Sequence, residues 1–413
     1  MLGYARLLAD VDGRGGDRMG AVHAMDNPVR DYAWGSPTAL PELAGRQPTG
    51  APEAELWMGA HPGAPSFVGG RPLGALLADD PDRVLGPDLV ARGGHHLPFL
   101  LKILGVGSPL SLQVHPSAEQ ARTGFAAEEE SGILWDAPER SYRDPYAKPE
   151  MIVALSDFDA VCGFRRPLEA RELVTRLGTP RLCRLLDDLG GDDVSAGLGA
   201  AFARLVTWPV ADRPALVAEA ATAARSAYGC EAYSWLVHLA RLYPADPGAL
   251  APLLLSTVKL APGQGLLLGP GVPHAYLRGT AIEIMGASDN VLRAGLTTKH
   301  VDVDGLLATV RVNVEPVPVL KPQPAGPEEV WPSDDIPDFR LSRIRVVPGE
   351  QPARLDRRGP QVLVCVDGIV EVTDGLTTLA LRSGASAFVE AVAPEVVVRG
   401  RGEVFRATAG LRP

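Results

Sequence analysis

The chain has 413 residues, which is too long for one ordinary hydrophobic core and indicates two or three domains. Apolar residues make up 46% and charged residues 22%, the balance of a globular protein that folds in water, and no apolar run reaches the length of a membrane-spanning helix. The formal net charge of -10 disfavours nucleic acid and anionic membranes as partners, because both would repel the surface.

The first 24 residues have no helical or strand periodicity, and they lack the basic start and apolar stretch of a secretory signal. We expect this leader to be poorly ordered, as a dispensable extension or a misassigned start, with Met25 as the native first residue. A recognisable pattern begins at "MDNPVRDYAWGS".

The segment 25–164 has short apolar runs between Gly, Pro and Asp clusters, which predicts strands and turns. One of these runs, "LQVHP", covers residues 112–116. Because side chains alternate along a strand, Gln113 and His115 should project into one cavity while Leu112 and Val114 face the opposite layer. Such a pair is either a buried histidine satisfied by an amide or two metal ligands.

Residues 165–250 have apolar residues at helical spacing with Gly or Pro stops, which predicts an all-helical insertion. The β pattern returns in 251–320, so one β domain is interrupted and resumed. After a Pro-rich connector, the segment 321–413 alternates strands and "DG" or "SGAS" turns, as in a sandwich or jelly roll. The last histidine of the chain is His300, so we expect no metal in this C-terminal unit.

Four candidate metal ligands lie in predicted strands or turns, namely Gln113, His115, Glu150 in "KPEM" and His274 in "GPGVPHAY". Two imidazoles, a carboxylate and an amide oxygen suit a divalent metal, above all zinc, with room left for water or substrate. The site contains no thiolate, so a closed structural zinc site is not indicated.

The stretch "AIEIMGASDNVLRAGLTTKH" is more polar than a core strand. Its Asn290 is equally compatible with a turn and with a functional role. Arg293 has a clearer interpretation, because a fixed guanidinium beside a metal can stabilise an oxyanion and can attract an anion to an acidic protein.

Seven motifs follow one another along the chain: "YAWGS", "ELWMGAHP", "LPFLLKIL", "SLQVHPS", "YAKPEM", "GPGVPHAYLRG" and "EIMGASDNVLRAGLTTKHVDV". In sequence and in order they resemble the motifs of the type I mannose-6-phosphate isomerases, also called phosphomannose isomerases. The resemblance runs from about residue 32 to 303. It implies a mainly β fold with an α insertion: a cupin-type β barrel or jelly roll formed by 25–164 and 251–320, a helical domain at 165–250, and a C-terminal cupin-like β domain at 321–413.

The resemblance also implies roles for individual residues. The zinc ligands fall on Gln113, His115, Glu150 and His274, with one Zn²⁺ per chain, and the catalytic arginine falls on Arg293. The other residues expected to line the pocket are Trp34, Glu55, His61, Lys102, Ser111, Lys148, Tyr276, Glu283, Asp289 and Lys299. The family usually has a small residue between the Gln and the His, whereas this chain has Val114, whose side chain should point away from the metal.

The implied reaction interconverts mannose 6-phosphate and fructose 6-phosphate by moving a proton between C1 and C2 through an enediol, which would feed mannose use or the supply of GDP-mannose precursors. The proton-transfer base is Lys148, Glu283, Asp289 or a water on the zinc, and the sequence does not choose among them. His61 and Asp289 are candidates for opening the sugar ring. Lys102, Ser111 and Lys299 are candidates for binding the phosphate.

Two other functions fit parts of the pattern. An iron-dependent cupin oxygenase also gathers histidines and a glutamate around one metal, but Gln113 is a weak ligand for redox iron. A non-catalytic sugar-binding cupin would keep the pocket without needing Arg293.

The four scattered cysteines form no CxxC pair, which indicates a reducing cytoplasm. We therefore expect a cytoplasmic monomer whose partner is a small sugar phosphate, with no nucleic acid and no membrane.

Overall fold

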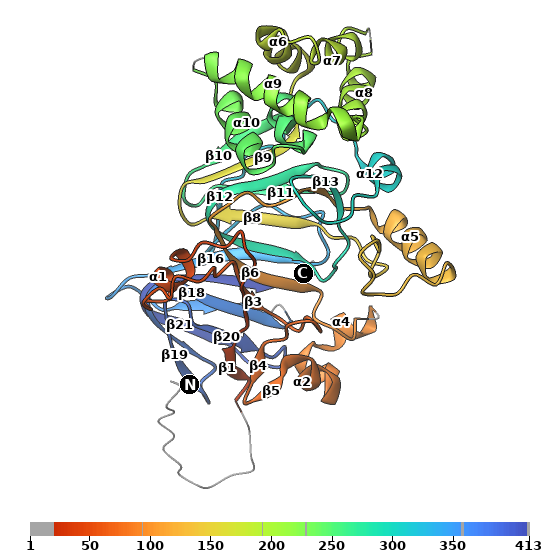
Figure 1. Cartoon of the computed structure of the whole chain (residues 1–413). Coiled ribbons are helices and arrows are strands. Elements are labelled where there is room, and N and C mark those ends of the chain that lie inside the picture. Colours follow the sequence, from red (N-terminus) through yellow and green to blue (C-terminus); the bar gives the residue numbers. More distant parts are fainter. Residues whose placement is uncertain (1–19, 93, 192, 228, 357–358, 411–413) are drawn as a thin grey trace.

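The computed structural model describes residues 20–92, 94–191, 193–227, 229–356 and 359–410. Two antiparallel β sheets form the body of the molecule, and a group of helices covers one end of it (Figure 1). The blue C-terminal strands lie at the end opposite these helices.

The first sheet contains the candidate site. Among the described residues its strands are β2 (Val29–Arg30), β3 (Glu55–Met58), β6 (Phe99–Val106), β7 (Leu112–Val114), β8 (Glu150–Ala154), β9 (Phe158–Phe164), β10 (Leu255–Leu260), β11 (Gly265–Leu268), β12 (His274–Gly286) and β13 (Leu292–Gly295). Strand β12 is central to this sheet, because it pairs with β6, β7, β8 and β9, and β13 joins through β7.

The second sheet is formed mainly by the C-terminal segment. Its described strands are β1 (Val22–Asp26), β4 (Phe67–Val68), β5 (Arg71–Pro72), β14 (Gln323–Ala325), β15 (Glu328–Val330), β16 (Arg340–Val346), β17 (Ala353–Leu355), β18 (Gln361–Thr373), β19 (Thr378–Arg382), β20 (Ser386–Val389) and β21 (Val396–Thr408). The two sheets share one apolar core, in which Leu101 and Ile282 of the first sheet lie with Phe388 and Phe405 of the second.

The pairing of β1 corrects two sequence-based expectations. Strand β1 is antiparallel to β20, with Val22 opposite Val389, so residues 22–24 are part of a sheet and not of a poorly ordered leader. Residues 1–19 of that predicted leader lie outside the described residues. Strands β1, β4 and β5 also belong to the second sheet, although the predicted division placed them in the catalytic unit from residue 25. The cause is pairing between segments more than 300 residues apart, which local periodicity does not encode.

A helical segment separates β9 from β10. It consists of α6 (Pro167–Leu177), α7 (Cys183–Asp188), α8 (Val194–Val206), the 3₁₀ helix η1 (Val210–Asp212), α9 (Arg213–Ser226), α10 (Glu231–Leu242), the 3₁₀ helix η2 (Pro247–Leu250) and α11 (Ala251–Leu254). Helix α6 shows why the sequence folds this way. Pro167 occupies its first turn, Leu173 and Leu177 are buried on one face, and Gly178 ends the helix at φ 58°.

The helical segment packs against the back of the strands that form the site. Its core contains Phe202 and Leu236 together with Leu112, Leu292 and Leu296 of the β segment. Val114 and Ala275 lie in the same core, as alternation along a strand predicts. One face of these strands is therefore fixed by the helices, and the other face is free to form a site.

The remaining described helices are short, except for α5. They are α1 (Ala39–Leu43), α2 (Leu73–Asp79), α3 (Pro81–Val84), α4 (Pro87–Ala91), α5 (Ala118–Glu130) and α12 (Val303–Thr309). No single helix in the described part of the chain is both long and apolar enough to cross a membrane; the segments Val194–Val206 and Val210–Ser226 reach that length and composition only as a pair bent by 84°.

The predicted fold class, a mainly β protein with helices inserted in the first β segment, is confirmed. The two sheets are not closed into barrels. The exact domain boundaries stay a prediction, with the corrections given above for residues 22–24 and for the three N-terminal strands.

Candidate active site

Three neighbouring strands bring the predicted residues into register. Gln113 of β7 pairs with His274 of β12 on one side and with Arg293 of β13 on the other. His115 follows Gln113 on the same face of the chain, while the alternate residues of β7 face the helical core. The amide, both imidazoles and the guanidinium thus come from adjacent strands.

The end of β7 is defined by local sequence. Pro116 follows His115, and Ser117 begins α5 with a capping box, in which its hydroxyl accepts from the Gln120 N–H while the Gln120 side chain accepts from the Ser117 N–H. The chain therefore turns away at once after His115 and keeps this histidine at the rim of the strand.

Strand β12 carries two functional positions because it changes partners along its length. His274 lies in the part that pairs with β7 and β9, whereas Glu283 lies in the part that pairs with β6 and β8. Gly279 lies between them at φ 121°, and an added Cβ would be 2.5 Å from the carbonyl oxygen of Asp157. Only glycine tolerates this conformation and this approach, so it allows the strand to serve both regions.

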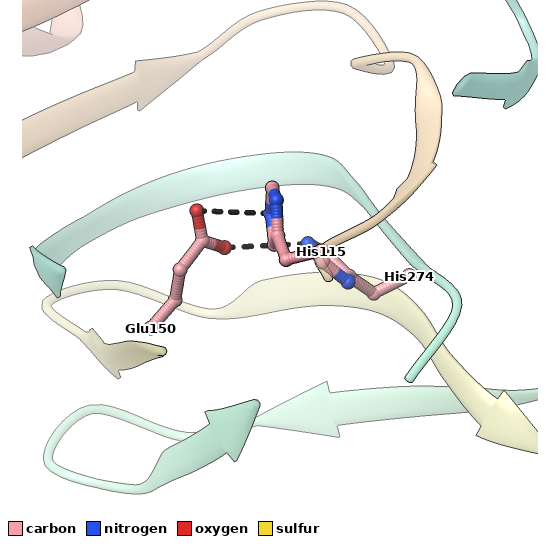
Figure 2. Close-up of side chains that lie close together, drawn as sticks. All are labelled: His115, Glu150 and His274. Carbon is pink, nitrogen blue, oxygen red and sulfur yellow. Dashed lines mark ion pairs between the residues drawn. The ribbon is translucent and has the colours of Figure 1, made fainter. Parts of the chain in front are cut away.

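His115, Glu150 and His274 form a buried cluster (Figure 2). His115 Nε2 is 3.2 Å from Glu150 Oε1, and His274 Nε2 is 3.3 Å from Glu150 Oε2. The Gln113 amide nitrogen is 3.4 Å from His274 Nε2, so this side chain reaches the same point. The candidate ligand atoms of the three clustered residues lie within 4.8 Å of one another.

Both imidazoles are oriented by backbone carbonyl groups. His115 Nδ1 is 2.7 Å from the carbonyl oxygen of Asn290, and His274 Nδ1 is 2.9 Å from that of Val272. A carbonyl only accepts, so each Nδ1 carries the proton and each Nε2 presents a lone pair to Glu150. This is the arrangement by which proteins fix the tautomer of a metal-binding histidine.

The charge states also suit a cation. Burial lowers the pKa of His115 to about 4, which keeps this imidazole neutral near pH 7. Burial alone would raise the pKa of Glu150, but the Lys148 ammonium, 3.1 Å from Glu150 Oε1, opposes this rise and favours the charged carboxylate. His115 Nε2 and Glu150 Oε2 are buried without a hydrogen-bond partner, although unsatisfied buried atoms are costly. A divalent cation between two imidazoles and a carboxylate would satisfy both.

A cavity of about 510 Å³ opens beside the cluster. Its lining includes the predicted residues Trp34, Glu55, Lys102, Ser111, Gln113, Lys148, Glu150, Tyr276, Glu283, Asp289, Arg293 and Lys299. His61 does not line it but lies behind Asp289, with 3.0 Å between His61 Nε2 and Asp289 Oδ2. His115 and His274 are almost fully buried, with 2% and 1% of their surfaces exposed.

A second group of charges surrounds Lys102 on the wall of the cavity. Lys102 Nζ is 3.2 Å from Glu283 Oε2 and 3.7 Å from Glu55 Oε2, and it lies 5.0 Å from the centre of the Trp57 ring. Burial raises the pKa of Glu283, although the Lys102 ammonium opposes this rise. Lys102 already contacts two carboxylates, so the geometry does not favour its predicted role as a phosphate ligand.

Three cations of the cavity lack such partners. Arg143, Arg293 and Lys299 form no ion pair with an acidic group among the described residues. Burial lowers the pKa of Arg293, and the neighbouring Arg143 lowers it further. Burial lowers the pKa of Lys299 as well, and both arginines add to this effect. Like charges gathered without an ion-paired carboxylate create an anion site.

Asn290 has a structural role. Its amide nitrogen donates to the carbonyl oxygens of Asp144 and Tyr146, its amide oxygen accepts from the Arg143 N–H at 2.7 Å, and its own carbonyl orients His115. The side chain is fully buried. Of the two interpretations that the sequence left open, these contacts favour a loop anchor that acts through the histidine.

Several lining residues escaped the sequence analysis. They are Tyr32, Trp57, Arg143, Tyr243, Thr297 and Thr298. Arg143 and Trp57 stand inside or beside the recognised motifs, so their charge and aromatic character could have marked them. Tyr243 follows the last long helix of the insertion, and no local signal indicates that it reaches the cavity.

The sheet architecture and the buried cluster of two histidines and a glutamate define a metal-site enzyme of the cupin type. Residues 22–167 match the family described as phosphomannose isomerase type I, catalytic domain. A mannose-6-phosphate isomerase of Escherichia coli K12 is 37% identical over 393 residues, which cover 92% of this chain and 97% of that one. The chain belongs to the type I phosphomannose isomerase family.

Solved structures agree with this assignment. A mannose 6-phosphate isomerase from Salmonella typhimurium bound to fructose 6-phosphate and zinc superposes with a TM-score of 0.88 at 34% identity, covering 95% of this chain and all of that one. A mannose 6-phosphate isomerase bound with zinc and yttrium superposes with a TM-score of 0.87 at 35% identity and the same coverage.

Proposed function

We propose that the chain is a zinc-dependent aldose–ketose isomerase that interconverts mannose 6-phosphate and fructose 6-phosphate through an enediol. The observation that carries this proposal is the buried His115–Glu150–His274 cluster at the edge of a cavity that also contains Arg293. The relatives reported above are named for this reaction, and one of their structures contains both fructose 6-phosphate and zinc.

Gln113, His115, Glu150 and His274 would hold the metal. Their nitrogen and oxygen donors suit zinc, which would admit a substrate oxygen by expanding its coordination beyond these four side chains. When bound, zinc supplies a Lewis acid that polarises the carbonyl and hydroxyl oxygens of the sugar. The same donor set disfavours the iron oxygenase, because an amide replaces one histidine.

Arg293 would stabilise the negative charge that develops as the proton leaves carbon. Its half-buried guanidinium lies in register with Gln113, one strand away from the metal ligand, and no carboxylate among the described residues neutralises it. In a partly dry cavity a fixed donor of this kind lowers the barrier more than it would in water.

Glu283 is the best supported proton-transfer base among the three side chains that the sequence left open. Lys148 Nζ is 3.1 Å from Glu150 Oε1, so it supports a predicted ligand. Burial would raise the pKa of Asp289, but its bond to His61 lowers that pKa overall. Of the two carboxylates, Glu283 is the one whose pKa moves upward, towards the pH at which a base works best.

The remaining roles follow from position. The hydrogen-bonded pair of His61 and Asp289 would exchange protons with the sugar during ring opening. The phosphate would bind to Lys299 with Arg143 and Ser111, at the cationic part of the cavity. Trp34, Glu55, Lys102 and Tyr276 would shape the rest of the pocket. We further propose that the enzyme acts as a monomer in the cytoplasm.

A conversion carried out in D₂O tests both the reaction and its route. Purified protein with Zn²⁺ should convert mannose 6-phosphate to fructose 6-phosphate, and the product should carry deuterium at C1, because the base gives up the C2 proton to solvent. The measurement is proton NMR of the sugar phosphates. Absence of conversion contradicts the function, and deuterium at C1 excludes a direct hydride shift from C2 to C1.

Glu283→Gln tests the base in the same assay. The turnover number should fall by roughly 10²-fold or more, because general base catalysis contributes about that factor. Glu328→Gln is the matched control: Glu328 is equally buried and ion-paired, to Arg406, but lies in the second sheet. An unchanged turnover number for Glu283→Gln would assign the proton transfer to another residue.

A further inference from the structure

We propose that residues 246–248 of the helical segment, the turn that opens η2, position the chain that carries the anion-binding residues of the site. This turn follows α10, whereas the positioned chain, 295–299, follows Arg293 and ends at Lys299. The inference rests on the proposed function for the roles of Arg293 and Lys299, but the contacts that support it are independent of that function.

The two backbones touch without any side chain between them. A Cβ placed on Gly248 would lie 3.0 Å from Gly295 Cα and 3.0 Å from the Leu296 nitrogen. A Cβ placed on Gly295 would lie 2.8 Å from Asp246 Oδ1 and 3.0 Å from Gly248 Cα. These separations are tighter than ordinary van der Waals contact, so a single methyl group on either glycine must move the partner backbone.

The positioned chain is strained at the point of contact. Leu296 has φ 55°, and it is the one residue other than glycine with a positive φ among the described residues. A bulky L-residue in the left-handed region persists only where its surroundings determine the conformation. Here the surroundings are the helical core that contains the Leu296 side chain and the turn that contacts its nitrogen.

Beyond Leu296 the chain runs between two cavities. Thr297 and Lys299 line the active-site cavity and also a second cavity of about 300 Å³, which Phe202, Gly248 and other residues of the helical segment enclose from behind. Close packing therefore does not fix residues 297–299 from both sides. The polar support on the helical side is the carboxylate of Asp246.

Asp246 connects the turn to this chain. Its Oδ1 accepts from the Gly248 N–H at 2.7 Å, and its Oδ2 accepts a long hydrogen bond from the Thr297 N–H at 3.4 Å. Tyr243, three residues earlier, lines the active-site cavity directly. The helical segment thus contributes to the site in two ways. Tyr243 forms part of the cavity wall, and Asp246 supports the chain whose residues bind the anion.

Two substitutions with matched controls test this positioning role. Gly248→Ala adds one methyl group at the contact, and its control is Gly191→Ala, where an added Cβ meets nothing within 4 Å. Asp246→Ala removes the carboxylate, and its control is Asp193→Ala, a cap of α8 in the same helical segment. Each protein is measured for zinc content, melting temperature, kcat, KM and affinity for inorganic phosphate by calorimetry.

We expect Gly248→Ala and Asp246→Ala to weaken phosphate binding by about tenfold and to lower kcat by a similar factor, because small misplacements of catalytic groups are costly. Zinc content should stay the same and each variant should remain folded at the assay temperature, although Gly248→Ala should lower the melting temperature more than its control because the added methyl group lacks room. Native kcat and native phosphate affinity in both folded variants would overturn the proposal. Phosphate affinity is measured without turnover, so this test remains decisive even where the parent protein shows no isomerase activity.

Discussion

At the scale of single residues, the site depends on orientation as much as on composition. The protons on His115 and His274 are fixed by backbone carbonyls, so both free lone pairs point at one carboxylate. The sequence could predict the ligand types, since "LQVHP" places an amide and an imidazole on one face of a strand. It could not predict the carbonyl of Asn290, because that contact joins residues 175 positions apart.

Arg293→Lys tests whether this side chain takes part in the chemistry. The substitution keeps the charge but replaces a planar fork with a compact ammonium. If Arg293 stabilises the enediolate, kcat should fall by roughly 10²-fold or more, by analogy with the loss of an oxyanion donor. The measurement is the steady-state rate with mannose 6-phosphate, together with zinc content, which should not change.

The control for this variant is Arg278→Lys, because Arg278 lies in β12 but pairs with Asp159 and points away to solvent. A near-native kcat with only a raised KM in Arg293→Lys would remove Arg293 from the chemistry and leave it as a substrate anchor.

At the scale of elements, the clearest disagreement between sequence and structure is β1. The segment "VHAMD" is too short and too irregular to be predicted as a strand, and it is held by partners from the far end of the chain. The buried Glu390 helps to hold β1 against the second sheet, because its two carboxylate oxygens contact His23 of β1 and Arg83 of α3. Local patterns predict elements well only where an element carries its own periodicity.

Glu390 makes the stability of this junction depend on pH. Burial would raise the pKa of Glu390, but His23 and Arg83 outweigh it and lower that pKa below its ordinary value of 4.5. The unfolded chain therefore takes up the proton at higher pH than the folded chain, so the contribution is present above pH 4.5 and is lost as the pH falls through the folded value.

Glu390→Gln should lower the free energy of unfolding by about 2 kcal/mol at pH 7, since it breaks a buried charged hydrogen bond. The difference from the parent protein should shrink as the pH falls below 4.5. Urea unfolding at several pH values measures this, with Glu371→Gln at an exposed pair as the control. A difference that is the same at every pH would show that the carboxylate charge is not involved.

At the scale of the whole molecule, three parts meet around one site. The first sheet supplies the metal ligands, the helical segment packs behind β7 and β13, and the second sheet shares a core with the first (Figure 1). The order of β, helical and β segments could be predicted from the alternation of apolar periods. The positions of Tyr243 and of the turn at Asp246 beside the site could not be predicted, because they depend on tertiary packing and not on local sequence.

The central claim is that a metal held by Gln113, His115, Glu150 and His274 enables this chain to isomerise mannose 6-phosphate. The most direct measurement is the rate of fructose 6-phosphate formation by protein stripped with a chelator, before and after one equivalent of Zn²⁺ per chain is added. The account predicts no turnover in the stripped protein and full recovery with zinc, because these residues provide ligands but no redox group. Full activity in the metal-free protein would contradict it.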